Sequence, residues 1–172
     1  MNTNKQQLHL EYKLTHEWNI WFHHEKDNWA LSGYKQIYKF NTIIDFWKFY
    51  NNWDRVGGVT NKHFFLMRSD VTPIWEDQMN INGGCWSFKI NEDQADELWE
   101  DLSVYLLCNQ LCPVISDEIV GLSICLKKNN STVIKIWNKY SKNNSLKLIN
   151  EAILNKWGMD VIYIAHMPDN IS

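Results

Sequence analysis

The sequence predicts an α+β protein in which a mostly antiparallel sheet carries three amphipathic helices on one face. Short segments with β-strand patterning occur mainly in adjacent pairs with no helix between them, and such neighbours pair antiparallel. Three other segments have apolar side chains at helical spacing, which gives each helix an apolar stripe that can cover a sheet. The uncovered face, which is concave if the sheet curls, is then free for a ligand.

The predicted strands combine aromatic and β-branched residues with alternation of apolar and polar side chains. In the first of them Trp18, Ile20 and Phe22 alternate with mostly polar neighbours. We expect strands at 17–23, 36–40, 63–67, 85–90, 119–127, 133–138 and 161–164. The fifth and sixth form a hairpin that turns at Asn129 and Asn130.

The predicted helices each follow a residue that can cap a helix. Thr42 opens a capping box, Asn91 precedes a first turn rich in acidic residues, and Ser145 precedes a segment that ends at Gly158. We therefore expect helices at 43–52, 92–111 and 146–158.

Length and composition indicate one globular domain. The chain has 172 residues, of which 45% are hydrophobic and 22% charged, and we expect a single domain over 1–172 with a flexible arm at 1–13. It shows neither an apolar run of membrane-spanning length nor a signal-peptide pattern, so we expect a cytoplasmic protein without membrane contact, monomeric when unbound. The four cysteines lack zinc spacing and are expected to be free thiols, with no metal and no cofactor.

Charge and tryptophan content point to a ligand. The net charge of -3 argues against a broad positively charged surface that would bind nucleic acid. From residue 121 onward, however, lysines outnumber acidic residues, and a local basic strip can hold a few phosphates. The chain contains 10 tryptophans, which is more than a core needs, because Leu and Ile fill a core without a polar N–H that requires a partner. Some of these rings are therefore expected to stack on a nucleobase or a carbohydrate.

Candidate binding residues lie in two predicted loops and on one strand. Trp29 and Trp75 fall outside any apolar stripe, which indicates either ligand contact or packing over a sheet edge. Glu76 could pair with the N1–H and amino donors of a stacked guanine, or be an ordinary solvated acid. The period-two rule puts Lys135 and Trp137 on one face of their strand.

No catalytic residue is predicted. The histidines look scattered along the chain, and neither a nucleophile–base arrangement nor a phosphate-binding glycine loop occurs. An enzyme acting on the same ligand would need a metal site or a nucleophile that the sequence does not offer.

Five segments, in order, resemble elements of the eukaryotic translation initiation factor 4E family, the messenger RNA cap-binding proteins. They correspond to the family's W-x-x-W-F, K-F-x-T-x-x-D-F-W, P-x-W-E-D, G-G-x-W and I-x-I-W motifs and lie at 17–22, 39–51, 73–77, 83–86 and 134–137. The resemblance covers about 14–165. It implies a curved sheet with three helices on its convex face and the cap site on the concave side.

The resemblance also implies residue roles. Trp29 and Trp75 correspond to the rings that sandwich 7-methylguanine, Glu76 to the carboxylate on the guanine edge, and Trp137 to the ring near the N7 methyl group. Trp47 corresponds to the ring that receives the helical motif of a scaffold protein similar to factor 4G.

Further positions follow from the same resemblance. Ile43 and Leu14 are expected beside Trp47 at the scaffold contact. The family's His-Pro-Leu stretch corresponds to Tyr12, Lys13 and Leu14 here, so only the leucine is retained. The family's phosphate-binding arginine falls on Lys127 or Lys128. A family lysine falls on Val133, so we expect Lys135 to take its role.

The resemblance leads to two hypotheses. In the first, the protein binds capped messages and recruits a scaffold for translation initiation. In the second, it is a cap-binding repressor that does not engage the scaffold. The sequence is rich in Asn, Ile and Lys, which is compatible with an AT-rich genome such as that of a virus or parasite.

Overall fold

The structure is a computed structural model that describes residues 13–52, 63–127, 130–158 and 160–167. Seven strands form one sheet in the order β2-β1-β3-β5-β6-β4-β7, and all neighbours pair antiparallel. The strands are β1 (Lys13–His23), β2 (Tyr34–Thr42), β3 (His63–Arg68), β4 (Gly84–Asn91), β5 (Ile119–Leu126), β6 (Ser131–Asn138) and β7 (Val161–Ala165). The helices are α2 (Ile43–Tyr50), α3 (Glu92–Leu107) and α4 (Glu151–Trp157). The predicted α+β class is confirmed.

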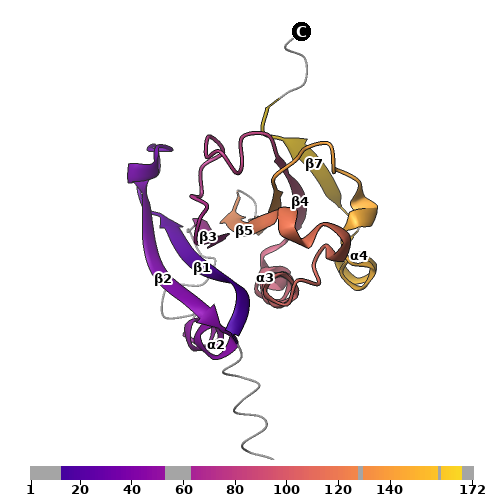
Figure 1. Ribbon diagram of the computed structural model, residues 1–172, viewed down its shortest axis with the longest axis horizontal. Helices are drawn as coiled ribbons and strands as arrows, with labels where there is room; N and C mark the ends of the chain where they lie inside the picture. The colour runs from indigo at the N-terminus through magenta and orange to yellow at the C-terminus, as the bar shows by residue number, and fades with distance from the viewer. Residues whose placement is uncertain (1–12, 53–62, 128–129, 159, 168–172) are drawn as a thin grey trace, which may run out of the picture.

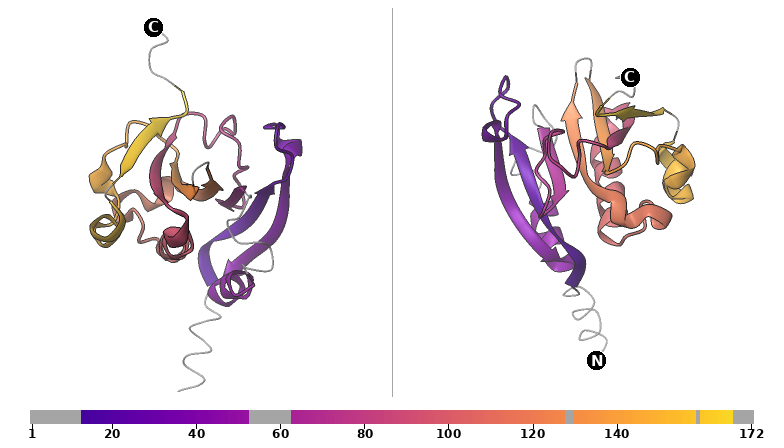
Figure 2. Two further views of the ribbon diagram at one scale, coloured as in Figure 1. Left: turned by 180° about the vertical axis from the view of Figure 1, so that it is seen from behind. Right: turned by 45° about the horizontal axis from the view of Figure 1, so that its top comes forward.

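The three helices cover the same side of the curved sheet, and β2 and β7 form its two edges (Figures 1 and 2). Phe46 of α2, Leu102 of α3 and Ile153 of α4 join one buried cluster with the sheet residues Leu66 and Ile136. Burial of apolar side chains on this convex side supplies the main stabilisation of the fold.

The opposite, concave face carries a second and smaller cluster, because successive side chains of a strand point to opposite faces. Phe65 and Met67 belong to it, whereas their neighbours Phe64 and Leu66 belong to the main core. We call this second set the concave cluster; it consists of Phe65, Met67, Val71, Cys85, Val120 and Trp137.

The first two helices start where the sequence predicts. Thr42 caps α2, with its Oγ1 accepting a hydrogen bond from the backbone N of Asp45 at 3.2 Å. Asn91 stands at the N-cap of α3 without a side-chain hydrogen bond. That helix ends at Leu107 and not at 111, because Asn109 takes a left-handed φ of 60°.

The third helix, α4, is shorter than the predicted range of 146–158. Ser145 caps only a 3-10 turn at Leu146–Leu148, and the α-helix starts after Asn150. Asn150 leaves the helical path because its backbone N donates to Leu111 O and its Nδ2 to Gln110 O, both at 2.8 Å. The segment that follows α3, through the carbonyl groups of Gln110 and Leu111, therefore fixes the residue at which α4 begins.

The predicted N-terminal arm at 1–13 overlaps the described residues only at Lys13. Lys13 already belongs to β1 and pairs with Thr42 of β2. Residues 1–12 and Asn129 of the predicted hairpin turn lie outside the described residues, while Asn130 has the positive φ of 59° that suits a turn.

Candidate functional site

Two tryptophans from separate connections line one cavity of about 340 Å³ on the concave side. Trp29 lies between β1 and β2 and is 56% exposed, and Trp75 lies between β3 and β4 and is 46% exposed. Both connections lie at the upper end of the molecule in Figure 1. A half-exposed indole is costly unless something contacts it, so the cavity is the candidate binding site.

Asn28 shapes the turn that presents Trp29. Its Nδ2 donates to Glu25 Oε2 at 2.8 Å, and its Oδ1 accepts from the backbone N of Ala30 at 3.1 Å. The turn also needs Gly33, because a Cβ there would lie 2.0 Å from the Asn28 carbonyl oxygen. Trp29 therefore sits on a connection with its own hydrogen-bonded frame.

Asp77 and Asn80 shape the connection that presents Trp75. Asp77 Oδ2 accepts from the backbone N and the Oγ1 of Thr72, at 3.0 and 2.6 Å. Asn80 is fully buried, and its Nδ2 donates to the carbonyl oxygens of Thr72 and Ile74 at 3.0 and 2.8 Å. These bonds do not involve the indole, which is left to contact a ligand.

The floor of the cavity comes from the sheet. Lys135 and Trp137 of β6 both line it, which confirms their predicted common face, while Ile134 and Ile136 point into the main core. Trp137 is 7% exposed, and its Nε1–H donates to Ser123 Oγ at 3.0 Å. The floor thus combines an oriented indole with an ammonium group.

The other predicted ligand residues lie around this cavity or outside the described chain. Glu76 is exposed directly after Trp75, and burial together with the Glu76 carboxylate raises the pKa of Tyr34 in the cavity wall to about 12. Lys127 is exposed at the end of β5, and Lys128 lies outside the described residues.

The expectation that the histidines are scattered is wrong. β1 and β3 pair antiparallel with Phe22 opposite Phe64, which brings the rings of His23 and His63 to 6.0 Å. Both rings contact Trp29. The sequence offers no local signal for this cluster, because His23 and His63 are 40 residues apart along the chain and come together only when β1 pairs with β3.

His63 is uncharged at neutral pH. Burial is the main cause and, with smaller electrostatic contributions from nearby His23, Lys127 and Lys135, lowers the pKa of His63 to about 3. The wall of the cavity next to Trp29 therefore does not gain a positive charge from this ring, and a cationic ligand is not repelled by it.

His166 closes the other end of the cavity. Its Nδ1–H donates to the Asn80 carbonyl at 2.7 Å, which leaves Nε2 to accept from the Cys85 thiol at 3.3 Å. Its ring centroid is 5.0 Å from that of Trp137. Burial raises the pKa of Cys85 to about 12, so this thiol is protonated and is not an activated nucleophile.

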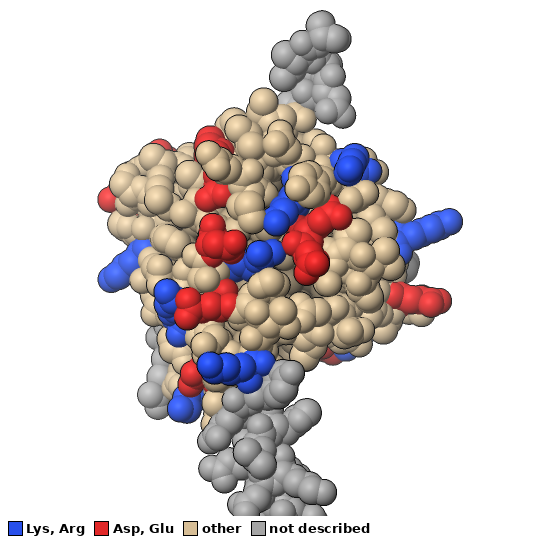
Figure 3. All heavy atoms as spheres, viewed as in Figure 1, with Lys and Arg blue, Asp and Glu red and all other residues tan. Residues whose placement is uncertain are grey.

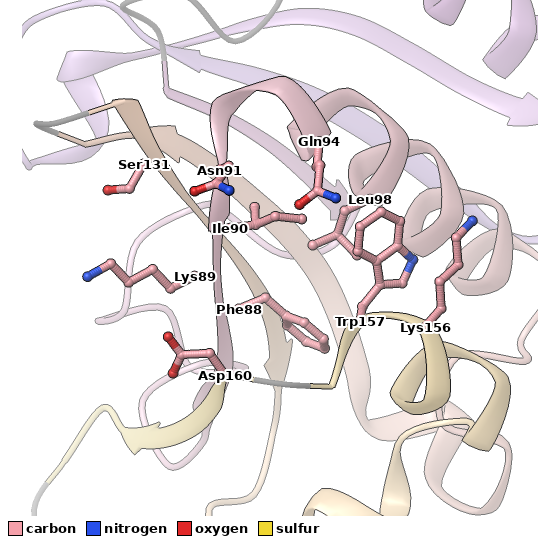
Figure 4. Close-up of a pocket in the computed structure, with 10 residues that line it drawn as sticks. All are labelled: Phe88, Lys89, Ile90, Asn91, Gln94, Leu98, Ser131, Lys156, Trp157 and Asp160. Carbon is pink, nitrogen blue, oxygen red and sulfur yellow. The ribbon is translucent and has the colours of Figure 1, made fainter.

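A second cavity of about 400 Å³ lies between the end of β4, the start of α3 and the end of α4 (Figure 4). Its floor consists of core side chains such as Phe88 and Leu98. Trp157 and Lys156 at its rim are already bound to Asp101, at 2.9 and 3.0 Å. Among the described residues, none of those predicted to bind a ligand lines this cavity.

The predicted scaffold residues lie near one another around the start of α2. Ile43 and Trp47 are one helical turn apart on α2 and both half-buried. Leu14 is next to Lys13, which pairs with the helix cap Thr42, so it lies beside the start of α2. The predicted division between a core Phe46, 2% exposed, and a half-buried Trp47 is confirmed.

Acidic and basic side chains are interspersed on the face seen in Figure 3. In the described ranges, no group of three His, Cys, Asp or Glu side chains could hold a metal ion. No helix in that part of the chain is long and apolar enough to cross a bilayer.

Sequence comparisons identify relatives over most of the chain. The profile of the family "Eukaryotic initiation factor 4E" matches residues 13–166. The eukaryotic translation initiation factor 4E-1 of Oryza sativa is 27% identical over 143 residues, which are 80% of this chain and 61% of that protein. The factor NCBP of Arabidopsis thaliana is 28% identical over 136 residues, 75% of this chain and 59% of its own. The chain thus spans about three fifths of the length of these curated relatives.

Solved structures share the fold. Ascaris suum eIF4E-3, solved in complex with the m7G cap, superposes with a TM-score of 0.77 at 21% identity, over 94% of this chain and 95% of that one. Caenorhabditis elegans eIF4E-3, solved with the 4E-binding protein Mextli, gives 0.78 at 20% identity, over 91% and 94%. These relatives are plant and animal proteins and do not support the expectation of a viral source. With a profile match over nearly the whole described chain and the same fold, this protein belongs to the eukaryotic initiation factor 4E family.

Proposed function

We propose that this protein binds the 7-methylguanosine cap of messenger RNA, with the methylated base stacked between Trp29 and Trp75. One observation carries the proposal. Two half-exposed indoles, each on a connection with its own hydrogen-bonded frame, line a single cavity with a third indole and an ammonium group on its floor.

The chemistry of the cavity suits this ligand. Methylation at N7 makes guanine cationic, so each indole face contributes a cation–π term of about 0.5 to 2 kcal/mol. Glu76 accepts the N1–H and amino hydrogens of the guanine edge, and Trp137 lies against the N7 methyl group. Lys135 and Lys127, with Lys128, bind the triphosphate bridge, where each acts as a point charge because lysine lacks the bidentate fork of arginine.

Family membership supports a binding role in translation. Initiation factor 4E proteins are not enzymes, in agreement with the prediction of no catalytic residue. A related protein of the same fold has been solved with an m7G cap. The proposal places the protein in the cytoplasm, bound to capped messages, as a single cap-binding domain that is monomeric when unbound.

Quenching of tryptophan fluorescence by 7-methyl-GTP and by GTP tests the proposal directly. A sandwich of two indoles on a cationic base predicts strong quenching by the methylated nucleotide and much weaker quenching by GTP. Equal quenching by both nucleotides would contradict recognition of the cap.

The convex surface formed by Leu14, Ile43 and Trp47 extends the proposal to a protein partner. A half-buried Trp beside Ile43 makes a small apolar groove suited to an amphipathic helix, as a scaffold of the factor 4G type would supply. The related C. elegans protein has been solved with a 4E-binding protein. If this surface binds no such helix while the cap is bound, the protein is instead a cap-binding repressor that does not engage the scaffold.

Glu76→Gln should weaken recognition of the guanine edge while leaving the stacking rings in place. The change replaces one acceptor with a donor that faces guanine donors, and a mispaired buried polar group costs about 1–3 kcal/mol. Affinity for 7-methyl-GTP should therefore approach that for a 7-methylated analogue without the exocyclic amine. Asp70→Asn, a neutralised acid outside the cavity, is the matched control. If Glu76→Gln preserves the preference for the amine, Glu76 does not recognise the base.

Lys135→Ala should weaken binding of 7-methyl-GTP more than binding of 7-methylguanosine, because only the nucleotide carries phosphates. The affinity for 7-methyl-GTP should also depend less on salt, since a phosphate contact is lost. Lys35→Ala, an exposed lysine of β2 that does not line the cavity, controls for the loss of one positive charge. Equal weakening of both ligands would show that Lys135 acts through packing.

A further inference from the structure

His23 lies directly against the ring of Trp29. The two ring centroids are 4.1 Å apart and the planes differ by only 13°, a face-to-face stack. The imidazole is itself 9% exposed, and its Nε2–H donates to the Asn28 carbonyl oxygen at 2.7 Å. This hydrogen bond ties the end of β1 to the residue just before Trp29.

The imidazole covers the face of the indole that is turned away from the cavity. Trp29, Tyr34 and His63 all line the cavity, and His23 contacts each of these rings without lining it. Since one face of Trp29 is stacked and the side chain is still 56% exposed, the remaining face is open on the ligand side.

We infer that His23 is a positioning residue that holds the Trp29 indole ready for the base, so that the bound state is a stack of imidazole, indole, methylated base and the second indole. The inference rests on the proposed function. An unsupported tryptophan on an exposed connection would sample several rotamers and lose that freedom when the ligand binds. A ring stacked behind it removes much of that cost before binding, which increases affinity without touching the ligand.

Replacing His23 should therefore weaken 7-methyl-GTP binding only through Trp29. His23→Ala should raise the Kd by about 2- to 10-fold, the range expected when one side chain must be ordered on binding. His23→Phe keeps the ring without the hydrogen bond and should stay within about twofold of the wild type, whereas His23→Gln, which has a donor but no ring, should behave like His23→Ala. His16→Ala is the matched control, because His16 is on the same strand but contacts Trp18, a residue of the main core.

A double-mutant cycle with Trp29→Ala separates positioning from a general structural role. In the Trp29→Ala background, His23→Ala should add no further loss of affinity. An additional loss of the same size there would overturn the inference, because His23 would then act independently of Trp29. If His23→Ala alters folding, the comparison of His23→Phe with His23→Gln decides, and equal affinities of these two would also overturn it.

The same set of proteins distinguishes this inference from the proposed function. Weak binding by Trp29→Ala with unchanged binding by both His23→Ala and His23→Gln would refute the role of His23 and leave cap recognition intact. Unchanged binding by Trp29→Ala would instead refute the indole sandwich on which the inference rests.

Discussion

Trp75→Ala is expected to raise the Kd for 7-methyl-GTP by about 5- to 150-fold, the range that corresponds to loss of one base–aromatic stack. Trp29→Ala should have a similar effect. The proposed function assigns one face of the base to each indole, and alanine has no ring to stack on that face. Fluorescence titration and retention on cap resin both measure the loss.

The fold should survive this substitution. Trp75 is 46% exposed, and its connection is held by the hydrogen bonds of Asp77 and Asn80, which do not use the indole. The melting temperature should therefore stay close to that of the wild type. Tyr140→Ala is a well-matched control, because Tyr140 is an aromatic residue with the same 46% exposure that does not line the cavity. Full retention on cap resin by Trp75→Ala, or an equal loss by Tyr140→Ala, would refute the sandwich.

Trp47→Ala is expected to abolish binding of an amphipathic scaffold peptide and leave 7-methyl-GTP binding unchanged. Phe46 and Trp47 point about 100° apart on α2, and only Phe46 is deep in the core. The ring of Trp47 instead packs edge-on against Tyr50, with centroids 5.6 Å apart, at the border of the core. Peptide binding measured by calorimetry, beside a cap titration of the same sample, tests the separation of the two activities.

Two substitutions on the same helix provide the comparison. Lys48→Ala removes an exposed neighbour and should affect neither activity. Phe46→Ala removes a buried ring and should destabilise the domain by about 3–5 kcal/mol, reducing both activities together. If Trp47→Ala behaves like Phe46→Ala, with a lowered melting temperature and loss of both activities, then Trp47 serves the core and not a partner.

Local patterning was sufficient for most of the fold. Every predicted strand and helix exists, because alternation and helical spacing each follow from backbone geometry over a few residues. The same geometry correctly put Lys135 and Trp137 on one face of β6. The boundaries failed where distant parts of the chain compete for a backbone group, as at Asn150, which bonds to Gln110 and Leu111 and so delays α4.

The sequence by itself determined which rings are available for binding: Trp29 and Trp75 lie outside any apolar stripe, and Trp75 also lies within a family motif. Only the tertiary structure decided what surrounds them. Antiparallel pairing of β1 with β3 brings His23 and His63 against Trp29, and the docking of β7 beside β4 places His166 against Trp137. These contacts join residues far apart in the chain, so they depend on strand register and on packing across the whole sheet, which no local pattern of residues encodes.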